Sequence, residues 1–287
     1  MAQVLCPTTA VDLPIITDGN AYQAQWTKAK SDAIIDTSGL PSQGHALYLL
    51  STVDFHIGHV FHLYDSEEFA KALQDFYGDI EHKAESSKLW YIQFLVIMAF
   101  GETFLLPPTK SKQPPVCSPY FTRAMSLLPD LSEMWNDPIL SIEVLALVAL
   151  YLYSLDMRDS SCCYVCLQFS NEEVGPSIDL RIQIGQAMRM ALIEGLHRPL
   201  PVELEPRLAD RWTNIWWTVY ILDNKFSASV GIPRSVRDET VAARLWDPMR
   251  CDKEKIGISL HVKVTQVISR VLSCIICFGG NMILWMF

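Results

Sequence analysis

The chain has 287 residues, of which 50% are hydrophobic and 19% are charged, and its formal net charge at pH 7 is -9. This length is enough for one large core, and so small a charged share predicts that most elements are well covered. The charge argues against a chain that binds nucleic acid by itself, because phosphate binding needs a local excess of Lys and Arg and no run of five basic residues occurs.

Residues 1–38 are predicted to form a poorly ordered leader. They lack the positively charged start and the continuous apolar stretch of a secretory signal, so disulfides are not expected. Two Cys-x-x-Cys pairs, 163/166 and 274/277, lie far apart among the eight cysteines. Because a zinc thiolate site needs four converging ligands, we expect buried or incidental thiols, with no metal and no cofactor in this chain.

Three histidines, His56, His59 and His62, recur at three-residue intervals between Asp54 and Asp65. On a helix, His59 and His62 would share a face, and with an aspartate they would resemble a metal site. The pattern lacks the glutamate that a His-Glu-x-x-His metalloprotease uses as its general base. The favoured interpretation is half-buried histidines in a helix and turn that pack against aromatic rings.

Two segments, residues 89–100 and 139–155, are apolar on nearly all faces. Such segments are either membrane spans or the central helices of a large bundle. The first is too short to span a membrane, and the second contains Ser141 and Glu143 and falls short of about 20 apolar residues. We therefore predict two central bundle helices.

Two further segments are unusual. Residues 165–183 are largely polar around a Gly-Pro-Ser turn, which predicts an inserted surface loop, either specific to this lineage or derived from a translated intron. Residues 273–287 form an uncharged apolar tail. We favour out-of-frame or intronic sequence over a membrane anchor for this tail, because Gly279-Gly280-Asn281 interrupts a span that is already at the lower length limit.

A half-buried helix is predicted from Ile184, where apolar residues follow a three- and four-residue spacing. Gly195 is expected to end it, because glycine alone takes the left-handed conformation without steric cost. Pro206 begins a second, aromatic-rich helix that stops at Gly231-Ile232-Pro233. Asp223 lies near its buried stripe and needs a partner, for which the candidates are Arg198, Arg211 and His197.

These two helices resemble the middle homology region of fungal zinc-cluster transcription factors, known as the fungal-specific transcription factor domain. The family pattern is Gly-Leu-His-Arg, a charged stretch, Trp-Trp, an aromatic residue, an aspartate, a serine and Gly-x-Pro. Residues 40–77 are similar to the first segment of the family, so the resemblance covers about residues 40–270. The residues at matching spacings are Gly195, Leu196, His197, Arg198, Glu205, Trp216, Trp217, Tyr220, Asp223, Ser227, Gly231 and Pro233.

The chain departs from the family pattern at two places within this stretch. Asn214-Ile215 replaces the arginines that usually precede Trp-Trp, and Ile232 replaces the arginine between Gly and Pro. Trp216-Trp217 has two interpretations, an aromatic wall of an effector pocket or core packing, and we favour core packing. We likewise expect His197-Arg198 to tie the loop to Asp223 or to helix carbonyls rather than to bind a ligand.

The resemblance implies an all-α, bundle-like regulatory domain over residues 39–272 of a nuclear transcription regulator. Such a domain restrains or licenses activation of a metabolic or biosynthetic gene set, sometimes in response to a small effector, and its partners are related factors in homo- or heterodimers. Promoter DNA is contacted only through a separate six-cysteine module that holds two zinc ions, and these 287 residues contain no such run. No membrane contact is implied.

Two other classes of function stay open. One is an effector-binding or dimerising modulator that never touches DNA. The other, more distant, is a helical enzyme of the isoprenoid type, but no aspartate-rich magnesium motif occurs, and Asn136-Asp137 with Ser141 and Glu143 departs from the second magnesium motif in spacing. Nucleotide-binding and hydrolase motifs are also absent from the sequence, so we expect no catalytic residues.

Overall fold

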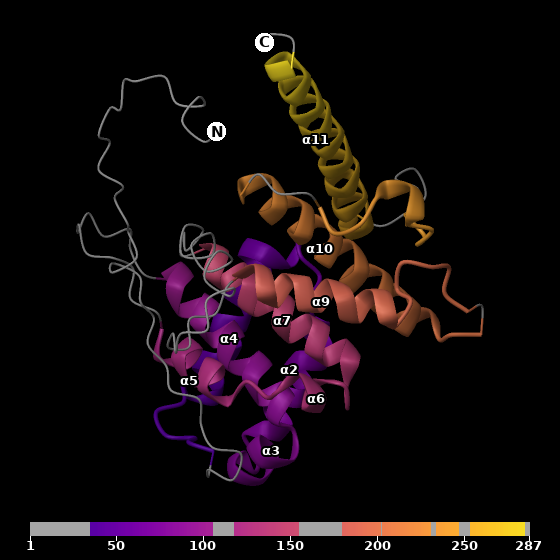
Figure 1. Cartoon of the computed structure of the whole chain (residues 1–287). Coiled ribbons are helices and arrows are strands. Elements are labelled where there is room, and N and C mark those ends of the chain that lie inside the picture. Colours follow the sequence, from indigo (N-terminus) through magenta and orange to yellow (C-terminus); the bar gives the residue numbers. More distant parts are fainter. Residues whose placement is uncertain are drawn as a thin grey trace, which may run out of the picture.

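The computed structural model describes residues 35–105, 118–154, 180–201, 203–230, 234–246 and 253–284, with residues 180–183, 229–230, 253–254 and 272–284 as backbone only. Every described element is helical, which confirms the predicted all-α class (Figure 1). The elements are α1 (Gln43–Val53), a π-helical turn η2 (Asp54–Gly58), α2 (Ser66–Phe76), α3 (Ile80–Ser86), α4 (Lys88–Leu105), α5 (Pro119–Leu127), α6 (Leu131–Met134), α7 (Pro138–Ser154), α9 (Leu180–Ile193), α10 (Pro206–Val230), a 3-10 turn η3 (Asp238–Thr240) and α11 (Lys253–Leu284).

Helices α4 and α7 form the centre of the bundle. Residues 91–101 of α4 and 141–152 of α7 are buried without interruption. Helices α1, α3, α5 and α7 pack around α4, while α9 and α10 cover α7. The prediction of two central helices is therefore confirmed. Among the described helices, only α4 is long and apolar enough to cross a membrane, and 61% of it is buried inside the protein, as in a core helix.

The first described residues are held against the bundle. The hydroxyl of Tyr91 on α4 donates to the carbonyl of Asp36 (2.9 Å), and the Asp36 carboxylate lies 3.1 Å from a guanidinium nitrogen of Arg123 on α5. These contacts fix the end of the segment that was expected to form a poorly ordered leader. Most of that leader, and residues 165–179 of the expected insertion, lie outside the described residues. From Leu180 the chain is helical.

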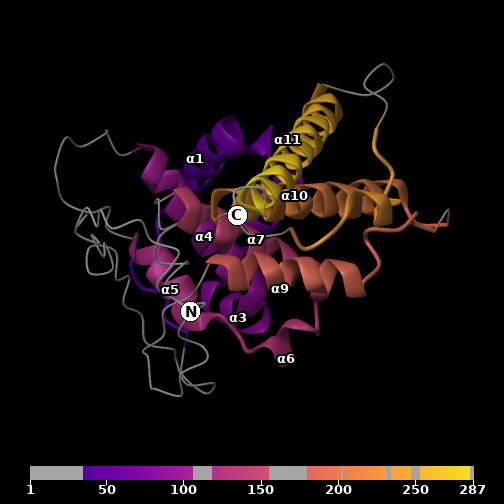
Figure 2. The same cartoon turned by 45° about the horizontal axis from the view of Figure 1, so that its top comes forward.

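Helix α11 runs beside α10 in the same direction. The Lys255 ammonium donates to Asp210 (2.6 Å) near the start of both helices, and the Ser269 hydroxyl donates to Asn224 (3.2 Å) fourteen residues further along each. Beyond this contact α11 continues away from the bundle in Figure 1, while in the view of Figure 2 the end of this helix lies in front of the bundle. The apolar tail expected from residue 273 continues this helix as far as Leu284.

Gly101 sets how closely α1 approaches α4. A Cβ atom at this position would lie 2.7 Å from the Cβ of Leu49 and 3.1 Å from its Cα, both of which are rigidly placed in α1. The two helices pack so closely that one must move if this space is filled.

We expect Gly101→Ala to destabilise the fold by about 1–3 kcal/mol, because the added methyl group overpacks a rigid contact. Gly44→Ala is the matched control, since a Cβ there meets nothing within 4 Å, and it should be neutral or slightly stabilising. Urea unfolding of both variants measures the difference. Equal stability of the two variants would contradict this packing.

Candidate functional site

The turn after α9 is a Schellman motif built on Gly195. Its φ is +75°, and the amide of Leu196 donates to the carbonyl of Ala191 (3.0 Å), while the amide of Gly195 donates to Leu192 (3.1 Å). A Cβ at Gly195 would meet nothing within 4 Å, so the backbone conformation, and not space, explains the glycine. The predicted helix stop is confirmed, and Leu196 is buried as the apolar contact of the motif.

His197 and Arg198 follow this turn and face different surroundings. The His197 ring lies against Trp216, with 5.9 Å between ring centroids, and burial together with the nearby Arg198 guanidinium lowers the pKa of the imidazole. A neutral ring therefore packs on the aromatic core at pH 7. Arg198 is exposed, and its Nε donates to His197 Nε2 (3.2 Å). The sequence had suggested that one of these side chains contacts Asp223, but neither of them reaches it.

The two tryptophans are core residues, as favoured from the sequence. Trp216 is fully buried and Trp217 is 3% exposed. The ring of Tyr220 stands edge-on to Trp217, 5.4 Å away at 83°, in a favourable aromatic geometry. Among the described residues, these two buried rings therefore do not line an open pocket.

A segment beyond α10, residues 234–246, folds back along that helix; we call it the strap. Its two buried side chains, Val236 and Trp246, anchor it in the core. Three of the residues that match the family pattern, which we call the signature residues, bind the strap from successive turns of α10. The strap runs back along the helix, so the partners of these three residues follow in the reverse order. The bonds run from Trp217 Nε1 to the carbonyl of Arg244 (2.9 Å), from the Tyr220 hydroxyl to Asp238 (2.5 Å), and to Asp223 from the Ser235 hydroxyl (2.6 Å) and amide (3.0 Å).

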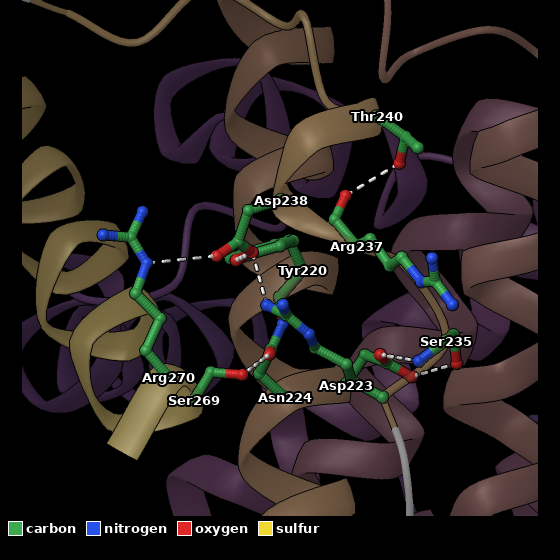
Figure 3. Close-up of polar contacts among 10 residues, drawn as sticks. Tyr220, Asp223, Asn224, Ser235, Arg237, Asp238, Thr240, Ser269 and Arg270 are labelled. Atoms are coloured by element: carbon green, nitrogen blue, oxygen red, sulfur yellow. Dashed lines mark hydrogen bonds and ion pairs between the residues drawn. The ribbon is translucent and has the colours of Figure 1, made fainter. Parts of the chain in front are cut away.

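The strap also contacts α9 and α11. The amide of Ala242 donates to the carbonyl of His197 (2.8 Å), which joins the strap to the Schellman turn. The Ser259 hydroxyl of α11 donates to the carbonyl of Trp246 (3.0 Å). Figure 3 shows Arg270 of α11 reaching toward Asp238, at 3.8 Å between charged atoms. One short segment therefore connects the last three long helices.

Asp238 is the most crowded acceptor of the strap. It accepts a hydrogen bond from the Tyr220 hydroxyl and lies near Arg270 (Figure 3). It also forms an ion pair with Arg234. Burial, and next the hydrogen bond to the Asp238 carboxylate, raise the pKa of Tyr220 well above its ordinary value. The phenol therefore stays protonated and acts as a hydrogen-bond donor throughout the physiological range.

The expected partners of Asp223 were wrong. This carboxylate is 4% exposed and accepts from Ser235, whereas Arg211 lies twelve residues earlier on the same helix, about 18 Å away along its axis. Burial raises the pKa of Asp223, while the two bonds from Ser235 and the charge of Arg234 act against that rise. Backbone and hydroxyl donors that are distant in sequence satisfy this buried group.

Arg211 instead forms a bidentate ion pair with Glu143 of α7. The guanidinium Nε and Nη2 lie 2.7 and 2.9 Å from the two carboxylate oxygens, and Gln93 of α4 donates to the same group (3.1 Å). Glu143 is fully buried, and this burial raises the pKa of its carboxyl, although Arg211 and Gln93 act to lower it. The pair joins the two central helices to α10. The sequence analysis did not predict this ion pair. The signal that could have indicated it was a glutamate in an otherwise apolar helix.

The histidine-rich segment serves packing and helix capping. His56 is stacked on Phe104, 4.5 Å between centroids, but it is exposed, as is His59, so the expectation of half-buried rings was wrong for these two. Asp54 accepts the Tyr64 hydroxyl (2.8 Å), and Asp65 caps α2. Within the described ranges no three His, Cys, Asp or Glu side chains are arranged to hold a metal ion. Gly231, Pro233 and the cysteine side chains lie outside what is described.

A hollow of about 510 Å³ lies far from the signature residues. Its carboxylates are Asp36, Glu81 and Glu85, the last two on α3 and exposed to solvent. Hydrogen bonds from Ser38 lower the pKa of Asp36, which opposes a role as a general acid. Nothing in this hollow resembles a catalytic constellation, and the lack of enzyme activity stays a prediction.

An all-α domain with a Gly-Leu-His-Arg turn and a Trp-Trp helix is the arrangement expected of a fungal regulatory domain. Residues 50–277 match the family described as the fungal specific transcription factor domain. The chain belongs to this family, which confirms the resemblance found in the sequence. No solved structure matches the chain.

Two similar proteins come from Schizosaccharomyces pombe, and each is named an uncharacterized transcriptional regulatory protein. One is 26% identical over 162 residues, which cover 56% of this chain and 22% of the relative. The other is 25% identical over 155 residues, which cover 53% and 17%. The matched part of this chain thus spans about a fifth of the length of these relatives.

The ion pair between Glu143 and Arg211 makes a pH-dependent prediction. Because the folded-state pKa of Glu143 is raised, the folded protein binds its proton more readily than the unfolded chain, and this carboxyl favours folding less as pH rises through that window. We expect Arg211→Met to cost about 2–4 kcal/mol at neutral pH and less near pH 5, because the orphaned carboxyl is then more often protonated.

Asp210→Asn is the control for this variant, since it removes only the half-exposed pair with Lys255 and should cost less than about 1 kcal/mol. Urea unfolding of both variants at the two pH values gives the comparison. A pH-independent loss in Arg211→Met, or one no larger than the control, would contradict the role of the pair.

The Asp223–Ser235 contact predicts a local effect on the strap. Ser235→Ala removes the hydroxyl donor from a buried carboxylate, so we expect a loss of about 1–2 kcal/mol and faster limited proteolysis within residues 234–246. Thr240→Val removes an exposed hydroxyl bond inside the strap and should change stability by less than about 0.5 kcal/mol. Similar cleavage rates for the two variants would show that Asp223 does not hold the strap.

Proposed function

We infer that this chain is the regulatory domain of a fungal transcription regulator that controls a metabolic or biosynthetic gene set in the nucleus. The match of residues 50–277 to the family carries this proposal. The names of the two yeast relatives support transcription regulation as the broader class. The gene set and the nuclear location follow from the family resemblance.

In this proposal, DNA is contacted by a separate zinc-binding module and not by this domain. The net charge of -9 supports that division, because a surface that neutralises phosphates needs clustered cations. Two arginines of this region, the largely buried Arg234 of the strap and the exposed Arg270 of α11, both face the carboxylate of Asp238, which offsets their charge. Zinc would accordingly belong to that module and not to this one.

The strap supplies a physical basis for regulation within this proposal. It binds the turn after α9 through one hydrogen bond and α11 through one hydrogen bond and the contact between Arg270 and Asp238, and each such contact is of modest strength. A small effector or a related factor that favours one arrangement of the strap would therefore reposition α11, because a ligand shifts an equilibrium by its differential affinity. This is how the domain would restrain or license activation.

A second candidate function is a dimerising or effector-binding modulator that has no DNA contact. The acidic charge and an uncovered apolar face on α11 favour this candidate. The two candidates differ in whether the chain changes transcription when it is placed at a promoter.

A promoter-tethering experiment tests the proposed function. Fused to an unrelated DNA-binding domain, the chain should change reporter output several-fold relative to that domain alone, and Arg211→Met should reduce the change while Asp210→Asn preserves it. Purified chain should show no tight, salt-sensitive DNA binding in gel shifts. No reporter change would contradict a regulatory domain, and tight DNA binding would contradict the division of roles.

A further inference from the structure

The hydroxyl of Ser235 connects an exposed residue to a buried charge. Ser235 lies in the strap, outside any helix, and its hydroxyl donates to the carboxylate of Asp223, which is 4% exposed (2.6 Å; Figure 3). Two other serines also donate to carboxylates, but Ser118 is buried and Ser66 is half-buried at the start of α2. Ser235 therefore combines access from solvent with direct contact to a buried carboxylate.

Arginines flank this serine on both sides. Arg234 precedes it, and Arg237 follows two residues later, after the buried Val236. Arg237 is exposed and forms no ion pair with any described residue. The strap thus presents a serine hydroxyl close to an unpaired cation. Protein kinases distinguish their substrates by such charge patterns, which acidic residues of the kinase groove recognise.

We propose that Ser235 is a phosphorylation site and that its modification releases the first residues of the strap from Asp223. The reaction needs a serine kinase that selects a nearby arginine, with ATP as the phosphoryl donor. The Ser235 oxygen forms a bond to the γ-phosphorus of ATP, and the bond between that phosphorus and the β,γ-bridging oxygen breaks. ADP leaves with the bridging oxygen, and the hydroxyl proton passes to the catalytic aspartate of the kinase.

Phosphorylation would replace an attractive contact with a repulsive one. The proton that Ser235 donates to Asp223 is lost, and a phosphate with a charge of about −2 at pH 7 takes its place beside the carboxylate. Little water surrounds Asp223 to screen this repulsion, because its side chain is almost fully buried. The amide of Ser235 donates to the same carboxylate (3.0 Å) and would move away together with the side chain.

The flanking arginines offer the phosphate new partners. Guanidinium groups bind phosphate oxygens through two parallel hydrogen bonds, and Arg237 can do so without leaving a described ion pair. Arg234 would have to leave Asp238. The other end of the strap stays anchored, because Trp246 is buried in the core. The expected change is therefore local and does not unfold the bundle.

The effect of this modification on transcription rests on the proposed function, whereas the site itself does not. Release of the first residues of the strap would disturb Asp238, whose carboxylate lies 3.8 Å from Arg270 of α11. Phosphorylation of Ser235 would then be a signal that changes how the strap holds α11.

Mass spectrometry of the full chain recovered from fungal cells tests whether the site is used. Phosphate is expected on Ser235, and Arg237→Ala should lower its occupancy at least about 10-fold, because the kinase loses the cation that it recognises. Arg189→Ala is the matched control, since it removes an exposed arginine of α9 and should leave the occupancy unchanged. A wild-type chain without phosphate on Ser235, or equal occupancy in the two variants, would overturn the proposed site.

Native-state hydrogen exchange of the full chain, with phosphoserine installed at position 235, measures the release. The protection of the Ser235 amide, relative to an unstructured peptide with the same modification, should fall at least about 10-fold, while the amides of α4 and α7 keep theirs. Phosphoserine at Ser86 is the charge-matched control, since this exposed hydroxyl donates only to a carbonyl of α3 (3.4 Å). Unchanged protection at Ser235, an equal effect of the control, or unfolding of the bundle would overturn the release.

Reporter output separates this inference from the proposed function. If Ser235 carries phosphate but the promoter-tethered chain leaves transcription unchanged, the proposed function fails and the site stands. If the reporter responds while Ser235 stays unmodified in the same cells, this inference fails and the proposed function stands.

Discussion

The bidentate contact between Glu143 and Arg211 is the constraint on which the arrangement of the other helices depends. A carboxylate with no exposed surface is costly in a protein interior unless it is paired and its remaining lone pairs are satisfied. Arg211 and Gln93 meet that requirement together, and they do so only if α4, α7 and α10 lie at one particular rotation and depth. This pair therefore adds a polar requirement to the apolar packing of these helices.

Further along α10, Trp217, Tyr220 and Asp223 lie on successive turns, and these three residues hold the strap. The family signature therefore has a structural explanation. Gly195 ends α9, His197 packs on Trp216 and accepts from the strap, and the polar atoms of the Trp-x-x-Tyr-x-x-Asp series each bind one point of the returning chain. The strap in turn contacts α11 through the carbonyl of Trp246 and the carboxylate of Asp238.

Sequence reasoning succeeded where the signal is local or periodic. Two apolar segments without a polar face indicated central helices, and Gly195 followed by Pro199 indicated a helix end, because both inferences depend on neighbouring residues alone. The family could be named because its residues have fixed spacings along the chain. The sequence also has apolar residues on two sides of α11, but it could not show which side the bundle would cover.

The failures concern pairs that are distant in sequence. Asp223 needed a donor, and the nearest charged candidates were considered, yet Ser235 satisfies it because the chain reverses after α10. Arg211 pairs with Glu143, 68 residues away, which only the packing of α7 against α10 brings into contact. His56 was expected to be half-buried against aromatic rings, but it is exposed while it stacks on Phe104. The spacing of residues along the chain does not show which distant residues will contact one another.

Native-state hydrogen exchange at two backbone amides tests the central claim, that the signature residues hold the strap. Ser235 and Ala242 are exposed residues outside regular α-helices, and their amides donate only to Asp223 and to the carbonyl of His197 among the described residues. The account predicts that both amides exchange at least about 100-fold more slowly than an unstructured peptide. Exchange of both at the unprotected rate, while the amides of α10 remain protected, would contradict it.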